Sequence, residues 1–289
     1  MSVKRKMKSV IKWLLNSIPA RKFVVNNITL SQNTLLDGRC ALITGGTSGI
    51  GYCIAETFLK SSGASVIITG RHEVKLNQAL EKLKRSSMVT DRVSGIVMDI
   101  SDISSMASKF MSIERVDILV NNAGILSNSI PSVSEKEFDN VINTNLKGAY
   151  FLSQLVAERM IESKIEGNIL NICSSSSLRP AISPYTLSKW GLRGFTIGLA
   201  KSLAPHGITV NGLAPGPTAT PMLIKDNTDN YLELKTSPIG RYLLPEEIAN
   251  LALVLVSPLG RGVVGDIIYC TGGCGTITYE DMDYSVFGR

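Results

Sequence analysis

The chain has 289 residues, 44% of them hydrophobic and 19% charged, a composition typical of a packed globular protein rather than a disordered one. No apolar run approaches the roughly 18–20 residues that a membrane-spanning helix needs. The net charge of +6 is concentrated in residues 1–22, which hold seven basic and no acidic residues; the rest of the chain carries −1 and offers no basic surface typical of nucleic-acid binding.

The basic N-terminus also carries apolar residues at helical spacing. They fall on one face of an amphipathic helix: Met7, Val10, Ile11, Leu14, Leu15 and Ile18. Because charged residues interrupt the apolar positions, the segment does not resemble a secretory signal. Three interpretations stay open for residues 1–22: contact with an anionic membrane surface, packing against the same or a partner subunit, or a mobile tail. We treat residues 1–36 as a basic amphipathic extension.

The cysteines and histidines are too scattered to suggest a metal site. The five cysteines form no C-x-x-C pair, and the only histidines are His72 and His206. We therefore expect no bound metal. The odd, scattered cysteines also favour a reducing cytoplasm, with a peripheral location at a membrane surface if the N-terminal helix binds one.

From residue 37 onward, short apolar runs rich in β-branched residues alternate with amphipathic helical patterns. The runs expected to form strands are residues 40–44, 65–69, 95–98, 117–120, 168–173, 208–213 and 266–270. The main helical patterns are residues 50–61, 73–85, 134–164, 183–203 and 245–256. This alternation predicts an α/β fold, a single-domain, Rossmann-like doubly wound parallel sheet of about seven strands with helices on both faces. We expect it to span residues 37–275 and leave residues 276–289 as a C-terminal tail.

The sequence TGGTSGIG, residues 44–51, directly follows the first expected strand. At the carboxyl end of a parallel strand, glycines let the backbone approach a phosphate at the N-terminus of the next helix. The spacing Gly45-x-x-x-Gly49-x-Gly51 differs from G-x-G-x-x-G, and the turn lacks the lysine of a P-loop. The turn therefore predicts a pyrophosphate site and disfavours nucleotide hydrolysis.

Further motifs occur in a fixed order at the ends of the later strands. They are Asp99, Asn121-Asn122-Ala123-Gly124, Asn145 in NTNLKG, Ser174 in NICSSSS, Tyr185-x-x-x-Lys189, VNGLAPGPTATPM after the sixth strand and CTGG at residues 270–273. Together with the glycine turn, this ordered set resembles the short-chain dehydrogenase/reductase family. The resemblance covers about residues 37–275, nearly the whole chain beyond the N-terminal helix.

The resemblance implies four catalytic residues. Tyr185 would donate a proton to a carbonyl oxygen, and Ser174 would donate a hydrogen bond to the same oxygen. Lys189, one helical turn from Tyr185, would hold the nicotinamide ribose, and its charge is expected to lower the Tyr185 pKa. Asn145 would position a water that relays protons to the lysine. Ser174 lies only 11 residues before Tyr185, a shorter gap than in many family members, so Ser175 remains an alternative.

The resemblance also assigns cofactor contacts, namely Gly45, Thr47, Ser48, Gly49, Ile50, Gly51, Arg71, Asp99, Ile100, Asn122, Ala123, Gly124, Tyr185, Lys189, Pro215, Gly216, Thr218 and Thr220. NAD-binding sheets place an acid at the end of the second strand to hold the ribose 2′-hydroxyl. Here Gly70 takes that place, and Arg71 follows with a donor fork suited to a 2′-phosphate. We expect NADP(H) to be preferred, with NAD(H) as the alternative, since Ser48 stands where many NADP-preferring members carry a basic residue.

The expected activity is hydride transfer between a ketone or aldehyde and an alcohol, in the reductive direction, similar to a 3-oxoacyl-carrier-protein reductase. Residues 222–240 are expected to form a lid over the substrate, whose identity stays open among acyl-carrier-protein-linked ketones, sugars, polyols and sterol-like compounds. The alternatives are a cofactor-binding scaffold or redox sensor with little turnover, or a sugar or polyol dehydrogenase. We expect a small-molecule substrate, no nucleic acid and, from the resemblance, a homodimer or homotetramer.

Overall fold

The computed structural model describes residues 34–60, 63–224 and 232–277. The predicted N-terminal amphipathic helix, residues 225–231 of the expected lid and all but the first two residues of the predicted C-terminal tail lie outside the described residues. Within the described ranges, no helix combines the length and the apolar character needed to cross a membrane.

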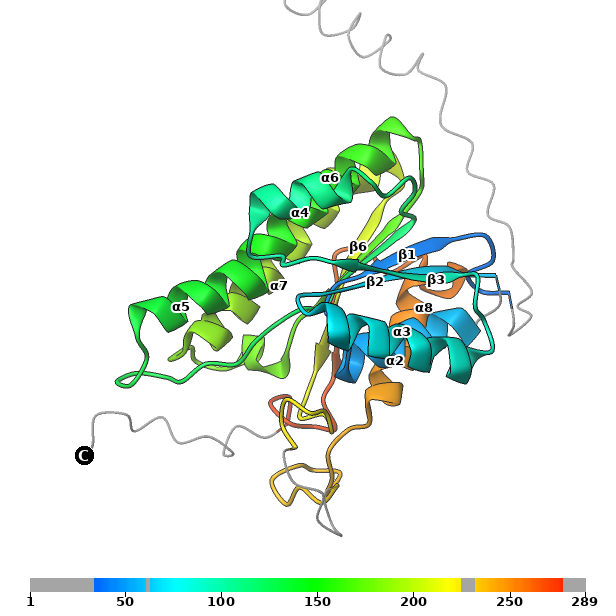
Figure 1. The fold of residues 1–289 in the computed structure, drawn as a ribbon. Helices are drawn as coiled ribbons and strands as arrows, with labels where there is room; N and C mark the ends of the chain where they lie inside the picture. Colours follow the sequence, from blue (N-terminus) through cyan, green and yellow to red (C-terminus); the bar gives the residue numbers. More distant parts are fainter. Residues whose placement is uncertain (1–33, 61–62, 225–231, 278–289) are drawn as a thin grey trace, which may run out of the picture. The chain divides into compact units, whose positions relative to one another are not determined.

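Seven strands form one parallel sheet in the order β3-β2-β1-β4-β5-β6-β7 (Figure 1). They are β1 (Cys40–Ile43), β2 (Ser65–Gly70), β3 (Val93–Val97), β4 (Ile118–Asn121), β5 (Asn168–Ile172), β6 (Thr209–Pro215) and β7 (Ile267–Cys270). The strand order reverses direction between β1 and β4. A doubly wound sheet of this kind binds its ligands at that switch point, outside the carboxyl ends of the strands.

Helices cover both faces of the sheet (Figure 1). On one face lie α2 (Gly49–Lys60), α3 (Glu73–Ser87) and α8 (Pro245–Val256). On the other lie α4 (Ile103–Phe110), α6 (Gly148–Glu162) and α7 (Pro184–Leu203), with α5 (Glu135–Ile142) leading into α6. Short 3₁₀ turns complete the order: η2 (Ser175–Leu178), η3 (Ala204–His206) and η4 (Pro258–Gly260). The predicted doubly wound α/β fold is confirmed.

The alternation of side chains along each strand explains why both faces need a helical layer. In β1, Ala41 and Ile43 belong to the hydrophobic core under α2, α3 and α8, whereas Leu42 belongs to the core under α4, α6 and α7. Both sets are fully buried. A strand whose every residue is apolar is therefore buried on both sides, which is the pattern of a central parallel strand.

Two local features differ from the sequence expectation. The continuous helix expected over residues 134–164 is divided into α5 and α6 by a π-helical turn, η1 (Asn143–Lys147). Hydrophobic periodicity does not register one wide turn inside a helix, and such turns are frequent at functional sites. In addition, α4 was absent from the main helical patterns. It is only 8 residues long, too short for a strong periodic signal.

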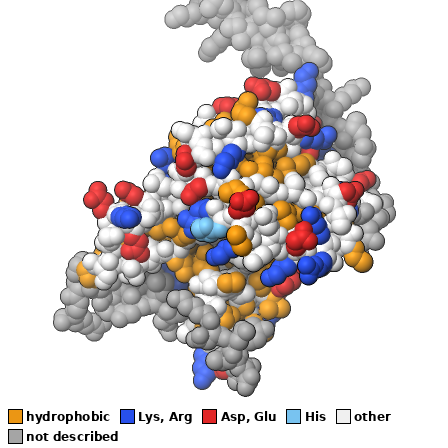
Figure 2. Space-filling view, in the orientation of Figure 1, with side chains coloured by type: hydrophobic (Ala, Val, Ile, Leu, Met, Phe, Trp, Pro, Cys, Tyr) orange, Lys and Arg blue, Asp and Glu red, His pale blue; other side chains and the backbone are white. Residues whose placement is uncertain are grey.

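On the surface, charged side chains of both signs are mixed, whereas large apolar side chains gather on two helices. Over the face drawn in Figure 2, basic side chains are interspersed with acidic ones rather than gathered in one basic patch. In contrast, several large apolar side chains are exposed on α6 and α7, namely Tyr150, Phe151, Leu187, Trp190 and Ile197. Exposed apolar groups that share neighbouring helices are typical of a surface that contacts another molecule.

Candidate active site

The glycine turn between β1 and α2 packs tightly against the segment that follows β4. Gly45 has φ +64°, a conformation that favours glycine, and a β-carbon there would lie 2.9 Å from the Cα of Ala123. A β-carbon on Gly51 would overlap the amide of Asn122. Both glycines are thus required by packing within the protein. Gly51 is buried and is not among the residues that line the cleft, so its expected cofactor contact stays a prediction.

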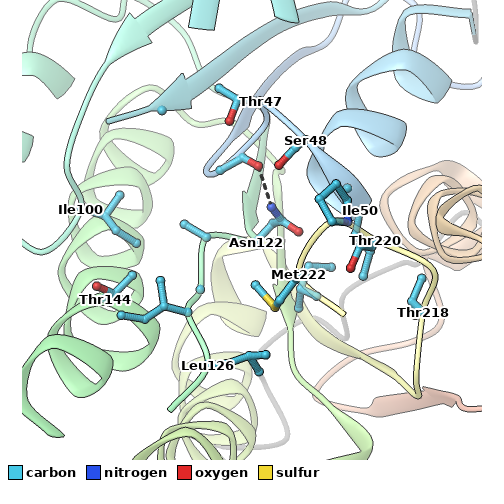
Figure 3. A pocket seen from close by; sticks show the side chains of 18 of the residues that line it. Thr47, Ser48, Ile50, Ile100, Asn122, Leu126, Thr144, Thr218, Thr220 and Met222 are labelled. Carbon is cyan, nitrogen blue, oxygen red and sulfur yellow. Dashed lines mark hydrogen bonds between the residues drawn. The ribbon is translucent and has the colours of Figure 1, made fainter. Parts of the chain in front are cut away.

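Hydrogen bonds fix the same two segments to each other. The Thr44 hydroxyl oxygen accepts hydrogen bonds from the N–H groups of Asn122 and Ala123 at 3.0 and 3.1 Å. The Asn122 side-chain amide donates to the carbonyl oxygens of Thr44 and Gly45 at 2.9 and 3.1 Å. Figure 3 marks one hydrogen bond of this amide with a dashed line. The switch point therefore has a rigid floor before any ligand binds.

A cleft of about 390 Å³ extends from this floor along the carboxyl ends of β1 to β6 (Figure 3). It is lined by all the predicted site residues except Gly51 and Asn145, namely Gly45, Thr47, Ser48, Gly49, Ile50, Arg71, Asp99, Ile100, Asn122, Ala123, Gly124, Ser174, Tyr185, Lys189, Pro215, Gly216, Thr218 and Thr220. Residues far apart in the sequence thus meet in one cleft because each follows a different strand of one sheet edge.

The end of β2 presents basic side chains to the cleft. A β-carbon on Gly70 would lie 2.5 Å from the Cγ2 of Thr47, so a side chain fits there only if the Thr47 side chain moves. The exposed Arg71, His72 and Lys75 line the cleft beyond it. His72 and Lys75 were not predicted. Lys75 lies in the first turn of α3, four residues after Arg71, and a second basic residue this close to Arg71 is the sequence signal that could have found it.

The end of β3 contributes an oriented carboxylate. Asp99 Oδ1 accepts hydrogen bonds from the N–H and the hydroxyl of Ser101 at 2.9 and 2.7 Å. The neighbouring Ile100 is buried and lines the same part of the cleft. Both residues, predicted from the sequence as cofactor contacts, therefore line the cleft.

After β5, the four consecutive serines have different surroundings. The Ser174 hydroxyl lines the cleft and accepts a hydrogen bond from the N–H of Ser176 at 3.1 Å. Ser177 donates to the Ser174 carbonyl oxygen at 2.8 Å. Ser175, the alternative to Ser174, is buried in η2 and is not among the residues that line the cleft. Of these two serines, Ser174 has its hydroxyl in the cleft.

The structure corrects the expected pKa of Tyr185. Burial of the phenol has the largest effect and raises its pKa, and a hydrogen bond with Ser174 opposes this shift. The expectation that Lys189 would lower this pKa is therefore wrong for the protein without a cofactor. Removing the phenol from water penalises the phenolate more than its neighbours stabilise it.

Lys189 lies on the next turn of α7, and its own pKa is perturbed. Its Nζ donates a hydrogen bond to the carbonyl oxygen of Ile172 at 2.7 Å and lies 5.8 Å from the centre of the Tyr185 ring. Burial lowers the Lys189 pKa from 10.5 to about 8, an effect that Cys173 partly opposes. A buried lysine and a buried tyrosine with shifted pKa values in one cleft are typical of a catalytic centre.

Asn145 lies behind the cleft in the π-helical turn. Its Oδ1 accepts from the N–H of Ile125 at 2.8 Å, and its Nδ2 donates to the Ile125 carbonyl oxygen and to the Ser188 hydroxyl at 3.0 and 3.1 Å. The Ser188 hydroxyl in turn donates to the Tyr185 carbonyl oxygen at 2.6 Å. The Asn145 side chain thus links the loop after β4 to the helix that carries Tyr185.

Sequence reasoning missed a second link between the same two segments. The Ser127 hydroxyl oxygen accepts a hydrogen bond from the N–H of Tyr185 at 3.1 Å, and the N–H of Ile130 donates to the Ile182 carbonyl oxygen at 3.1 Å. Ser127 belongs to no motif, and nothing in its sequence neighbours signals the contact. Only the fold brings it to the start of α7.

The loop after β6 closes the cleft opposite the glycine turn. The Thr218 hydroxyl donates to the Gly216 carbonyl oxygen at 2.9 Å, and a β-carbon on Gly49 would lie 3.3 Å from the Cγ2 of Thr220. Pro221, Met222 and Leu223 continue the lining. The first residues of the expected lid therefore adjoin the cleft.

Comparison with known proteins identifies the family. The family model for short chain dehydrogenases matches residues 39–231. The chain is 35% identical to gluconate 5-dehydrogenase of Gluconobacter oxydans (82% of this chain, 95% of that protein) and 36% identical to the 3-oxoacyl-[acyl-carrier-protein] reductase FabG of Aquifex aeolicus (82% and 98%). It is also similar to the crystal structure of a gluconate 5-dehydrogenase from Burkholderia cenocepacia in complex with NADP and tartrate (TM-score 0.74, 30% identity, covering 84% of this chain and 97% of that one).

The chain belongs to the short chain dehydrogenase family. It is an oxidoreductase that interconverts carbonyl and alcohol groups of small molecules, with NAD(P)(H) as the cofactor. The family resemblance drawn from the sequence motifs and the oxidoreductase activity expected from it are confirmed.

Proposed function

We propose that this enzyme reduces a ketone or aldehyde to an alcohol with NADPH, and that Tyr185 is its proton donor. The observation that carries the proposal is that Tyr185, Ser174 and Lys189 line one cleft together with the glycine turn. The raised pKa of the buried Tyr185 phenol means that this side chain carries its proton in the cofactor-free protein, as a proton donor must.

The cleft suits a nicotinamide dinucleotide. The first backbone N–H groups of α2 have no acceptor within the helix, so the helix start at Gly49 favours a pyrophosphate. Any side chain on Gly49 would narrow the space toward Thr220. When bound, the cofactor supplies a hydride to the carbonyl carbon.

The side chains of the cleft would handle the charge and the proton. Ser174 would donate a hydrogen bond to the carbonyl oxygen as it becomes negative. Tyr185 would transfer its phenolic proton to that oxygen, which gives the alcohol and a phenolate. The Lys189 ammonium would stabilise the phenolate until a proton from water replaces the one that was transferred. Asn145 would relay that proton through a water, as the family resemblance implies.

Basic residues at the end of β2 favour NADPH over NADH. Arg71 and Lys75 line the cleft where a ribose 2′-phosphate would lie, and Gly70 brings no carboxylate to this place. Thr47 also favours NADPH over NADH, because it occupies the space that a carboxylate side chain at position 70 would need. NAD(H) is the alternative cofactor.

We also propose a cytoplasmic homo-oligomer, a dimer or tetramer. The exposed apolar side chains of α6 and α7, among them Tyr150 and Trp190, support assembly. All five cysteines are free thiols, which suits a reducing compartment. Contact of residues 1–22 with a membrane surface stays a prediction, and vesicle sedimentation of the full chain against a chain without these residues tests it.

The test is a screen of ketones, aldehydes and alcohols with both nicotinamide cofactors, followed by nicotinamide absorbance. We expect reduction with NADPH by the wild type, and a loss of several orders of magnitude in kcat for Tyr185→Phe with little change in NADPH affinity, since only the transferable proton is removed. Cofactor binding without turnover on any substrate would instead favour a cofactor-binding scaffold or redox sensor. Retained activity of Tyr185→Phe would contradict the role of the tyrosine.

A further inference from the structure

Three large apolar side chains line the cleft and yet remain open to solvent. They are Leu126, Met222 and Leu223, which are 42%, 45% and 44% exposed. When an apolar part of a ligand covers apolar side chains in a cleft, their removal from water contributes favourable binding free energy. Their position along the cleft therefore bears on the substrate.

The first of these side chains comes from a loop that is hydrogen-bonded to the backbone of Tyr185. Leu126 stands between two anchored residues: Ile125, whose N–H and carbonyl oxygen both bond to Asn145, and Ser127, which accepts from the Tyr185 N–H. The loop that carries Leu126 is thus tied to η1 on one side and to the start of α7 on the other. These bonds fix the backbone on both sides of Leu126, whose side chain lines the same cleft as Tyr185.

The other two come from the loop after β6. The N–H of Leu223 donates to the Thr220 carbonyl oxygen at 3.0 Å, which closes a turn directly after the predicted cofactor contacts. In the view of Figure 3, Leu126 and Met222 lie toward the end of the cleft away from Thr47 and Ser48. The loops after β4 and β6 thus build one apolar end of the cleft.

Among the described residues that line the cleft, most of the charged ones lie away from these apolar side chains. Arg71, Lys75 and Asp99 follow β2 and β3, at the other side of the switch point. Near Tyr185 the lining includes Lys189, whose Nζ already donates to the Ile172 carbonyl oxygen. The cleft therefore has a charged end that suits the adenosine half of the cofactor and an apolar end beside Tyr185.

We infer that the substrate is a ketone with an unbranched alkyl chain, which lies between Leu126 and the Met222–Leu223 turn while Tyr185 protonates the carbonyl oxygen. The inference rests on the proposed function and specifies its substrate class. It separates the two kinds of relative, because a 3-oxoacyl chain suits this apolar end and a keto derivative of gluconate has hydroxyl groups in its place. The reaction itself is unchanged: the carbonyl carbon gains a hydride from NADPH and the oxygen gains the proton of Tyr185.

The experiment measures kcat/KM with NADPH for ethyl 3-oxo esters of increasing chain length, from the butanoate to the decanoate, and for 5-ketogluconate. We expect kcat/KM to rise about two- to fourfold for each added methylene that the apolar end covers, and 5-ketogluconate to be the poorest of these substrates. Leu126→Ser and Met222→Ser should flatten this rise, with NADPH affinity unchanged as the sign that the variants fold. Leu259→Ser is the matched control, since Leu259 is 46% exposed on η4, outside the cleft, and should keep the wild-type slope.

Two results for the wild type would overturn the inference and leave the proposed function intact: equal kcat/KM along the ester series, or a preference for 5-ketogluconate. If kcat/KM still rises with chain length in both Leu126→Ser and Met222→Ser, the alkyl chain of the substrate lies against another part of the protein, and the inference is also overturned. If the wild type reduces no carbonyl compound at all while it binds NADPH, the proposed function fails instead.

Discussion

The Ser127 hydroxyl oxygen accepts a hydrogen bond from the backbone N–H of Tyr185 at 3.1 Å. This N–H belongs to the first turn of α7, where backbone donors have no acceptor within the helix. The N-cap residue Ser183 already accepts from Thr186 at 3.1 Å. Ser127 therefore supplies a second capping contact, from another part of the chain, at the residue proposed as the proton donor.

We expect Ser127→Ala to lower kcat about three- to tenfold, because one lost hydrogen bond of roughly 0.5–1.5 kcal/mol lets the start of α7 shift relative to the substrate. KM for the cofactor should stay near the wild-type value. Ser127→Thr keeps the hydroxyl and should restore most of the rate, and Ser129→Ala in the same loop serves as the control. If Ser127→Ala and Ser129→Ala lower kcat equally, the loss comes from a general change in the loop and not from the hydrogen bond between Ser127 and Tyr185.

For the serines after β5, we expect Ser174→Ala to reduce kcat roughly 10²–10³-fold, the usual loss when a donor to a developing oxyanion is removed. Ser175→Ala should cost much less, because Ser175 is buried outside the cleft lining. Steady-state kinetics of both variants with one substrate decide the matter. The reverse order would assign the role to Ser175.

Stability should depend on pH through Lys189. Its pKa is about 8 in the folded protein against an ordinary value of 10.5, so between these values the unfolded chain binds a proton that the folded protein has released. Stability therefore rises with pH in this window, by as much as roughly 3 kcal/mol across its whole width. Tyr185 acts in the opposite sense only above its ordinary pKa of 10, because its raised folded pKa makes the folded protein keep the proton longer.

The measurement is denaturant unfolding of the cofactor-free enzyme at a pH of about 7.5 and of about 9.5. From the lower to the higher pH, the free energy of unfolding of the wild type should rise by roughly 1–2 kcal/mol more than that of Lys189→Met, in which residue 189 has no proton to release. Lys82→Met, at an exposed position of α3, should follow the wild type. Parallel behaviour of the wild type and Lys189→Met would mean that the Lys189 pKa is not lowered by burial.

The features of the site that were predictable from sequence are those that one residue and its immediate neighbours determine. A glycine turn after an apolar run places Gly45 at the end of a strand, and a helical spacing places Lys189 beside Tyr185. The failures share another cause. The Tyr185 pKa depends on burial by the whole fold, Ser127 reaches Tyr185 across 58 residues of sequence, and the π-helical turn at Asn145 is invisible to periodicity. Long-range packing determines each of these, and no local pattern records it.

Cofactor preference should depend on two basic residues. We expect the wild type to bind NADPH more tightly than NADH, and Arg71→Ala to lose roughly 10- to 150-fold of that preference, since charge-assisted hydrogen bonds contribute roughly 1.5–3 kcal/mol. Lys75→Ala should cause a smaller loss, because its ammonium is a single point charge on a flexible chain. Fluorescence titration of both cofactors measures the ratio, with Lys82→Ala on the same helix as the control. Tighter binding of NADH by the wild type would contradict the assignment.

Converting the enzyme to NADH should require two changes at the end of β2. Gly70→Asp supplies the carboxylate that holds a ribose 2′-hydroxyl, but its β-carbon would lie 2.5 Å from the Cγ2 of Thr47. The single variant should therefore bind both cofactors more weakly, because the Thr47 side chain, which lines the cleft, has to shift. Thr47→Ser removes the methyl group that is in the way and keeps the hydroxyl. We expect Gly70→Asp with Thr47→Ser to bind NADH at least tenfold more tightly than Gly70→Asp alone, and to disfavour NADPH by charge repulsion. Gly70→Ala separates the two effects, since it has the clash without the charge. If Gly70→Ala binds NADPH as the wild type does, Thr47 does not restrict this position.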